Sequence, residues 1–248
     1  MSLEILIILC LAGALFFLLR HYPEAKEAET VIRHHHLRDF FTRFSKMRRT
    51  KNEVEIARAV IDNANPEITP KEVIEAVNTY SDLDPAAAEN LYVAEKSLNE
   101  NDLRQAEEKS LAVISENKHC SGAYVVIGKV AEQRGQFDDA REAFLAAIKC
   151  RDGKDISEAY FGLGQIEQRN ENLSNSIKYF EKAINAEKGK PEWYFELGKA
   201  YIEVRQYAKA AKVLKRAASL DIDNQEYKTV SAEAEEKQRT HSFYSRGK

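Results

Sequence analysis

Apolar residues in the middle and second half of the chain recur at the spacing of amphipathic helices, and the whole pattern returns three times. Each copy holds an aromatic residue, then Ile or Leu followed by Gly, and later a stripe of small and large apolar residues four and three positions apart. Two short helices per copy cannot bury their apolar faces alone, so the copies must stack. The copies are Tyr124, Ile127, Gly128, Ala140, Phe144 and Ala147; Tyr160, Leu163, Gly164, Ser176, Phe180 and Ala183; and Tyr194, Leu197, Gly198, Ala210, Leu214 and Ala217.

A weaker fourth copy comes before these three, and helical segments flank the array on both sides. We assign residues 85–222 to an array of about four repeats, because Val93, Ala94, Leu103, Ala106 and Val113 fit the same spacing. Residues 52–84 form a helical pair, either a cap or a diverged repeat, whose second helix starts at Thr69, Pro70 and Glu72. Residues 223–248 supply a polar capping helix and, from residue 241, a frayed tail.

The first residues of the chain are its most apolar stretch. Residues 3–19 are apolar except for Glu4, and a helix of about twenty residues reaches about 30 Å, the thickness of a bilayer core. No Lys or Arg precedes this run and no small-residue cleavage site follows it, which favours an uncleaved anchor over a signal peptide. A buried N-terminal helix is the other interpretation. Because basic residues follow the run, we expect a transmembrane anchor at residues 1–20, with the N-terminus outside and the C-terminal domain cytoplasmic.

Residues 21–51 combine aromatic and basic positions in one predicted helix and linker. Its large apolar residues recur at helical spacing: Leu37, Phe40, Phe41, Phe44 and Met47. Two interpretations fit equally well: residues 33–51 lie on anionic lipid, or the aromatic face covers the first helices of the array. The run His34 to His36 points in different directions on a helix, so we do not expect a metal site there.

Composition and charge exclude several function classes. Five Pro and ten Gly suit a mostly helical protein, and a formal net charge of -3 gives no reason to expect nucleic-acid binding. The three cysteines, Cys10, Cys120 and Cys150, form no zinc or redox motif. No paired carboxylates and no nucleophile with a base stand out. We therefore expect a protein that is not an enzyme and has neither a cofactor nor a metal.

The last copy, with Tyr194, Leu197, Gly198 and Tyr201, resembles the signature of the tetratricopeptide repeat (TPR) family. Ala131 and Glu167 replace the inner aromatic residue in the other two good copies. The resemblance implies an all-α, TPR-like α-solenoid of helical hairpins. Together with the predicted anchor, the expected fold is this solenoid with an N-terminal transmembrane helix.

Family resemblance also implies a concave groove lined by the first helix of each repeat. Carried over copy by copy, the groove would contain Leu91 and Glu95, Val125 and Lys129, Phe161 and Gln165, and Phe195 and Lys199. Its apolar members would form a ladder suited to a helix or another segment with apolar anchors, whereas family members that clamp a terminal carboxylate need polar groups at these places. The alternative is that the terminal helix or a second copy of the protein covers the ladder.

These features favour a membrane-tethered TPR adaptor or scaffold that holds a protein or peptide partner at the cytoplasmic face and supports complex assembly. The alternative is a non-catalytic subunit of a membrane enzyme or of an envelope-assembly complex. The partner and the oligomeric state are not encoded in these patterns.

Overall fold

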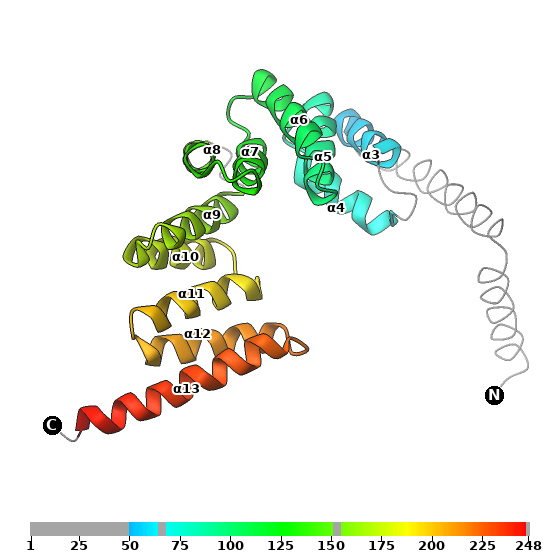
Figure 1. Ribbon diagram of the computed structural model, residues 1–248. Helices are drawn as coiled ribbons and strands as arrows, with labels where there is room; N and C mark the ends of the chain where they lie inside the picture. Colours follow the sequence, from blue (N-terminus) through cyan, green and yellow to red (C-terminus); the bar gives the residue numbers. More distant parts are fainter. Residues whose placement is uncertain (1–49, 64–67, 151–154, 247–248) are drawn as a thin grey trace, which may run out of the picture. The chain divides into compact units, whose positions relative to one another are not determined.

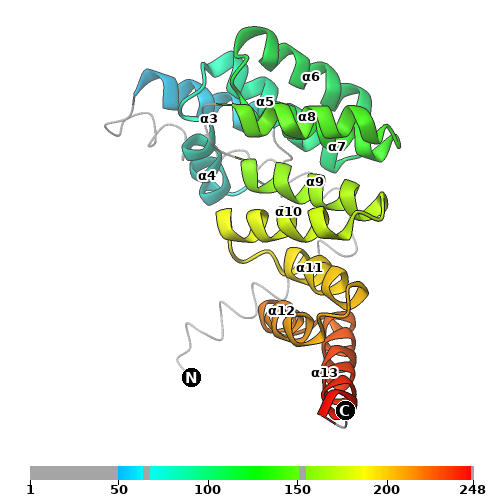
Figure 2. The ribbon, with the colours of Figure 1, turned by 90° about the vertical axis from the view of Figure 1, so that its left-hand side faces the viewer.

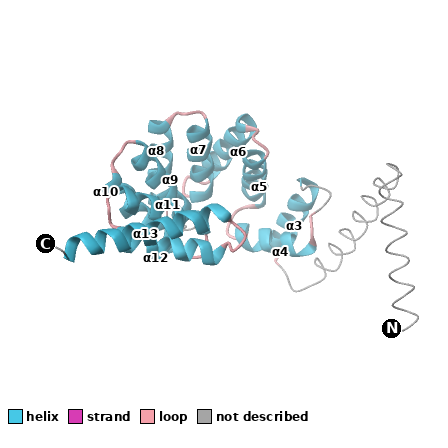
Figure 3. Cartoon of the chain, turned by 60° about the horizontal axis from the view of Figure 1, so that its bottom comes forward, coloured by secondary structure: helices cyan, strands magenta, loops and turns pink. Residues whose placement is uncertain are grey.

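The computed structural model describes residues 50–63, 68–150 and 155–246, which form eleven helices and no strand (Figure 3). The all-α prediction is therefore confirmed for this part of the chain. The predicted anchor at residues 1–20 and nearly all of the basic segment at 21–51 lie outside the described residues. Within the described ranges, no helix is both long and apolar enough to cross a membrane. The chain divides into two compact units, residues 1–92 and 93–248.

The first unit contains α3 (Lys51–Asn63), α4 (Pro70–Tyr80) and the beginning of α5 (Pro85–Asn99). The start of α4 is the capping box that the sequence predicts: the Thr69 hydroxyl accepts from the Glu72 N–H at 3.4 Å, and the Glu72 carboxylate accepts from the Thr69 N–H at 2.6 Å. Asn52 in the first turn of α3 donates to the carbonyls of Ser81 and Leu83, at 3.2 and 3.0 Å. The core of this unit includes Ile56, Ala57, Val60, Val73 and Val77.

In the second unit, helices follow one another as hairpins. They are α6 (Leu103–Glu116), α7 (Ser121–Gln133), α8 (Phe137–Lys149), α9 (Ile156–Arg169), α10 (Leu173–Ala186), α11 (Pro191–Glu203), α12 (Tyr207–Leu220) and α13 (Gln225–Arg246). We call α7, α9 and α11 the first helices of the three good repeats, and α8, α10 and α12 the second helices. Figures 1 and 2 show the three hairpins stacked in order, with α13 packed against α12.

The turn inside each hairpin has the same backbone in four successive copies. Asn101, Gly135, Glu171 and Arg205 all have positive φ, at 63°, 75°, 58° and 57°. The N–H of the following residue donates to the carbonyl five positions back at 2.8 Å each time, which is the closing bond of a Schellman motif. Three non-glycine residues therefore adopt the left-handed conformation because the repeat geometry requires it there.

Close packing between the two helices of a hairpin depends on the glycine of each first helix. A Cβ on Gly128 would lie 2.5 Å from the ring of Phe144, and one on Gly164 would lie 2.5 Å from the ring of Phe180. Phe144 and Phe180 are 1% and 0% exposed. The glycine therefore lets a large residue of the second helix pack against the backbone of the first, as its place in the repeated pattern predicts.

The last helix begins where the sequence predicts and ends later. The Asn224 side chain caps it by accepting from the N–H groups of Glu226 and Tyr227, at 3.0 and 3.2 Å. The structure continues α13 to Arg246, so it includes residues 241–246, which the sequence analysis assigns to a tail. Ala234 is buried in the same cluster as the core of α11 and α12.

Candidate binding hollow on the first helices

Side chains from the first helices of three repeats surround one hollow of about 320 Å³. α7, α9 and α11 supply most of its wall, and α8 adds the edge of Phe144. The size lies at the lower end of the range of small-ligand sites. Its lining residues are Lys129, Glu132, Gln133, Phe144, Glu158, Phe161, Gly162, Gln165, Lys190, Glu192 and Trp193.

A single carboxylate ties the three repeats together at the wall of the hollow. Glu158 on α9 forms ion pairs with Lys129 on α7 and with Lys190 just before α11, the latter at 3.2 Å. Burial alone would raise the pKa of Glu158, but the charges and hydrogen bonds of these two lysines outweigh it and hold the pKa below the ordinary value. Lys190 also pairs with Glu187 at 3.8 Å.

A second carboxylate in the hollow lacks such compensation. The side-chain carboxylate of Glu132 on α7 has no hydrogen bond or ion pair with any described residue. Burial raises its pKa, and the more distant charges of Lys129 and Arg169 only partly offset that shift. The hollow thus contains a half-buried acid whose charged form is under-stabilised.

Aromatic rings form another part of the wall. The rings of Phe161 and Trp193 stack with centroids 5.3 Å apart and an interplanar angle of 20°, and Phe161 also contacts Phe180 at 5.4 Å. The Lys190 ammonium lies 5.4 Å from the centroid of the Trp193 ring. Trp193 itself is buried, whereas Phe161 keeps part of its surface exposed.

The structure brings three of the eight predicted groove residues into this hollow: Lys129, Phe161 and Gln165. Leu91, Val125 and Phe195 are only 4%, 4% and 6% exposed, so the expected ladder offers little apolar surface at these positions. Phe195 packs against Tyr227 of α13, with ring centroids 4.7 Å apart. At this position the alternative that the terminal helix covers the ladder is therefore the one observed.

The last two polar positions of the predicted groove lie elsewhere. Lys199 pairs with Glu196 at 3.0 Å and lies over the Phe195 ring, 5.3 Å from its centroid. Glu95 is half-buried on α5. Neither residue lines the hollow.

Sequence reasoning missed Glu132, Glu158, Lys190 and Trp193. Glu132 lies one position before the last residue of its helix, and Lys190 lies immediately before Pro191, at the start of α11. These residues lie near the ends of helices that meet only when neighbouring repeats stack. Repeat spacing alone does not specify which helix ends come close together.

Two different residues at the inner aromatic position of the repeat, Tyr201 and Glu167, each contact the preceding hairpin. Tyr201 donates to Glu181 of α10 at 2.5 Å, and burial together with that carboxylate raises the pKa of the phenol. At the equivalent place Glu167, whose side chain is 3% exposed, meets Arg141 of α8 at 2.5 Å and accepts from Asn172 at 2.7 Å. The departure from the family signature at this position is thus a buried polar contact to the preceding repeat.

No group of three His, Cys, Asp or Glu side chains within the described ranges is placed to hold a metal ion. The run from His34 to His36 lies outside these ranges. Cys120 is buried and Cys150 is half-buried.

Comparison with known proteins agrees with this geometry. The family model described as tetratricopeptide repeat matches residues 98–155 and 125–192. The repeats within residues 98–192 are thus similar to tetratricopeptide repeats. Among solved TPR-type folds, PilF of Pseudomonas aeruginosa is 16% identical with a TM-score of 0.58, and the match covers 78% of this chain and 88% of that one. The C-terminal part of a TPR repeat-containing protein from Cytophaga hutchinsonii is 21% identical with a TM-score of 0.50, covering 69% and 67%. At these identities the likeness concerns the fold.

Two further matches extend along the repeats. The family model described as Regulator of microtubule dynamics protein 1-3 matches residues 166–242. The Protein CTR9 homolog of Arabidopsis thaliana is 28% identical over 121 residues, which is 48% of this chain. The match spans only 11% of the length of that relative.

Proposed function

We propose that this chain is a non-catalytic adaptor that holds a segment of a partner protein in the hollow formed by α7, α9 and α11. The observation that carries the proposal is the convergence of Lys129, Phe161 and Gln165 from two repeats, next to polar groups that include a carboxylate without a partner. TPR-type solenoids present such surfaces for polypeptides. A role as a non-catalytic subunit of a larger assembly would use the same surface.

Photocrosslinking from within the hollow tests this function. A photoreactive residue at Gln165, which is half-buried, is compared in native cells with one at Glu142, which is exposed on α8. We expect one dominant adduct from Gln165 that is absent from Glu142, and mass spectrometry of the adduct identifies the partner segment. Equal adduct patterns from both positions would count against the hollow as the binding site.

We further propose that residues 3–19 anchor the repeats to a membrane with the repeats on the cytoplasmic side. The apolar run and the basic residues that follow it support this. Anchoring would raise the effective concentration of any partner in the same membrane without new contacts. The full chain should resist alkaline extraction from membranes, whereas a chain without residues 2–19 should be released; release of both would contradict the anchor.

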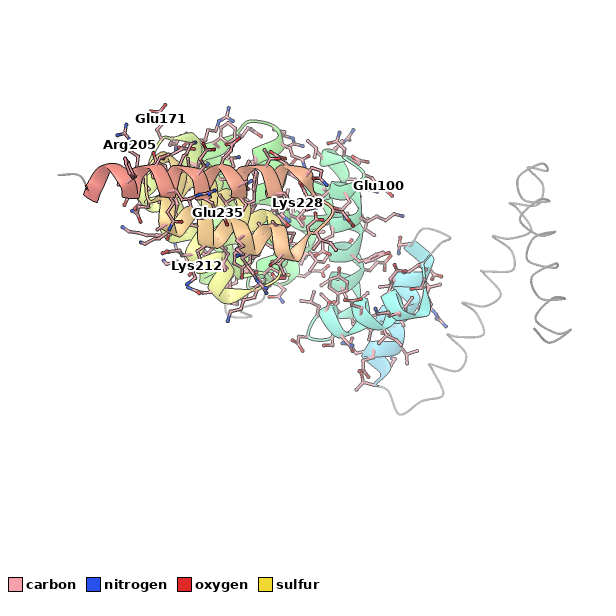
Figure 4. The ribbon with its side chains drawn as sticks, turned by 90° about the horizontal axis from the view of Figure 1, so that it is seen from below. Glu100, Glu171, Arg205, Lys212, Lys228 and Glu235 are labelled. Carbon is pink, nitrogen blue, oxygen red and sulfur yellow. The ribbon has the colours of Figure 1, made fainter. Side chains whose placement is uncertain are left out.

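The match to the Regulator of microtubule dynamics family favours a second candidate, attachment to microtubules or to proteins on their surface. α12 lies inside the matched range and bears four exposed basic residues and no acidic one: Lys209, Lys212, Lys215 and Arg216. Lys212 is labelled on this helix in Figure 4. Such a charged face attracts acidic surfaces in a salt-dependent way.

Co-sedimentation with purified microtubules tests the second candidate. We expect salt-sensitive binding that Lys212→Glu with Lys215→Glu removes, while Glu142→Gln leaves it unchanged. Sedimentation that does not respond to the double substitution would contradict a role for α12.

A further inference from the structure

We infer that the hollow on α7, α9 and α11 accepts a cationic side chain, arginine in particular, from the partner segment. This inference rests on the proposed function and specifies which chemistry the site selects. Its volume of about 320 Å³ suits a single side chain better than a whole helix. The partner's backbone would then lie across the opening while one residue enters.

Formal charge along the first helices becomes more negative toward the C-terminus. α7 carries one basic and one acidic residue, α9 carries two acidic and one basic, and α11 carries three acidic and one basic. The second helix α12 has the opposite character, with four basic residues and no acid. In the last repeat, the surface of the first helix α11 therefore attracts cations, whereas the surface of the second helix α12 does not.

Both lysines of the hollow are already engaged in ion pairs, and Lys190 pairs with Glu187 as well as with Glu158. Glu158 pairs with Lys129 and Lys190 simultaneously. The Glu132 carboxylate has no hydrogen bond or ion pair with a described residue, and Glu192, which also lines the hollow, interacts with Lys190 only through longer-range charge attraction. Among the residues that line the hollow, three carboxylates face two ammonium groups, so the lining carries one net negative charge.

The remaining wall fits a planar cation. Phe161 keeps exposed surface beside Trp193, and the ammonium of Lys190 over the Trp193 ring shows that this aromatic pair already stabilises a positive charge on one face. The side-chain amides of Gln133 and Gln165 have no hydrogen bond with a described residue and offer acceptor oxygens. A guanidinium can donate to a carboxylate and to amides while stacking on a ring, which an ammonium does less well.

The chain contains a single tryptophan, and it is Trp193 in this wall. Its fluorescence therefore reports on the hollow in the full-length chain without a label. The probes are three blocked tripeptides, acetyl-Gly-Arg-Gly-amide and its Lys and Glu counterparts. We expect a saturable fluorescence change with the Arg probe, a weaker one with Lys and none with Glu.

Variants of Glu132 and Glu192, the two lining carboxylates that form no ion pair, make the test specific. Glu132→Gln should weaken binding of the Arg probe roughly tenfold, the effect of losing one charge-assisted hydrogen bond. Glu192→Gln should weaken it less because Glu192 is exposed, and Glu142→Gln on α8 serves as the matched control with unchanged binding. Thermal denaturation followed by circular dichroism confirms that each variant is folded.

A stronger response to the Glu probe, or an affinity for the Arg probe that Glu132→Gln and Glu192→Gln leave unchanged, would overturn the inference. Absence of any saturable response to the three probes would overturn it as well. In each of these cases the adaptor proposal is decided separately by the crosslinks from Gln165, which do not depend on the charge of the bound side chain.

Discussion

Replacing Gly162 with Ala should destabilise the array, although a Gly-to-Ala change on an exposed helix surface usually stabilises that helix. The Phe144 ring lies between two first helices. A Cβ on Gly162 would lie 2.4 Å from its Cε2, while a Cβ on Gly128 would lie 2.5 Å from its Cε1, on the other edge. Ordinary carbon contacts are about 3.5–4.0 Å. The ring would have to move about 1 Å or more, and moving away from one helix brings it toward the other.

The magnitude follows from two opposing effects. Ala gains about 1 kcal/mol over Gly in a helix interior, and overpacking a core costs about 1–3 kcal/mol. Because the ring cannot yield on either side, we place the steric cost at the upper end and predict a net loss of about 2 kcal/mol for Gly162→Ala. The free energy of unfolding is measured by urea denaturation followed by far-ultraviolet circular dichroism.

A double-mutant cycle isolates the contact. Phe144→Ala alone should cost about 3–5 kcal/mol because it leaves a cavity. In that background the added methyl of Gly162→Ala enters the cavity, so the second substitution should be neutral or stabilising by up to about 1 kcal/mol. The coupling energy should then approach about 3 kcal/mol. An increase in stability for Gly162→Ala alone, or a coupling below about 0.5 kcal/mol, would refute the reasoning.

Three other outcomes can be measured on the same chain. Glu171→Gly should raise stability by about 1 kcal/mol by relieving positive φ, and Gly135→Ala should lower it by a similar amount, both seen in thermal denaturation. Glu158→Gln should destabilise at neutral pH. Because the folded-state pKa of Glu158 lies below its ordinary value, its contribution is complete above about pH 4.5 and is lost as the pH falls through the folded value. The difference in stability from wild type should therefore shrink as the pH falls below about 4.5. Tyr227→Ala should speed proteolysis of α13 because the ring contact with Phe195 is lost, whereas Tyr227→Phe should not.

The array could be predicted from sequence because its determinants are local and repeated. Gly128 and Phe144 recur with their counterparts at fixed spacing, so the close contact between the two helices of a hairpin follows from the pattern. The left-handed turn was harder to predict, because only one of the four equivalent residues, Gly135, is a glycine, the type that most readily adopts positive φ. At Glu171 and Arg205, which Figure 4 labels at the same edge of the molecule, tertiary packing overrides the residue preference.

The site was less predictable for a physical reason. Family resemblance identifies positions on one helix, but exposure depends on what the neighbouring elements cover. Phe195 was expected in the groove, and α13 packs against it. Glu132 becomes distinctive only because Lys129, the nearest cation on its own helix, is paired with Glu158 of the next repeat. Such competition between ion pairs is a property of the assembled repeats.

The central claim, that partners bind on the first helices, is tested most directly by hydrogen–deuterium exchange of the full chain with and without the partner segment identified by crosslinking. We predict slower exchange in α7, α9 and α11, with α8, α10 and α12 unchanged. Slower exchange confined to α12 or α13, with the first helices unaffected, would contradict the claim.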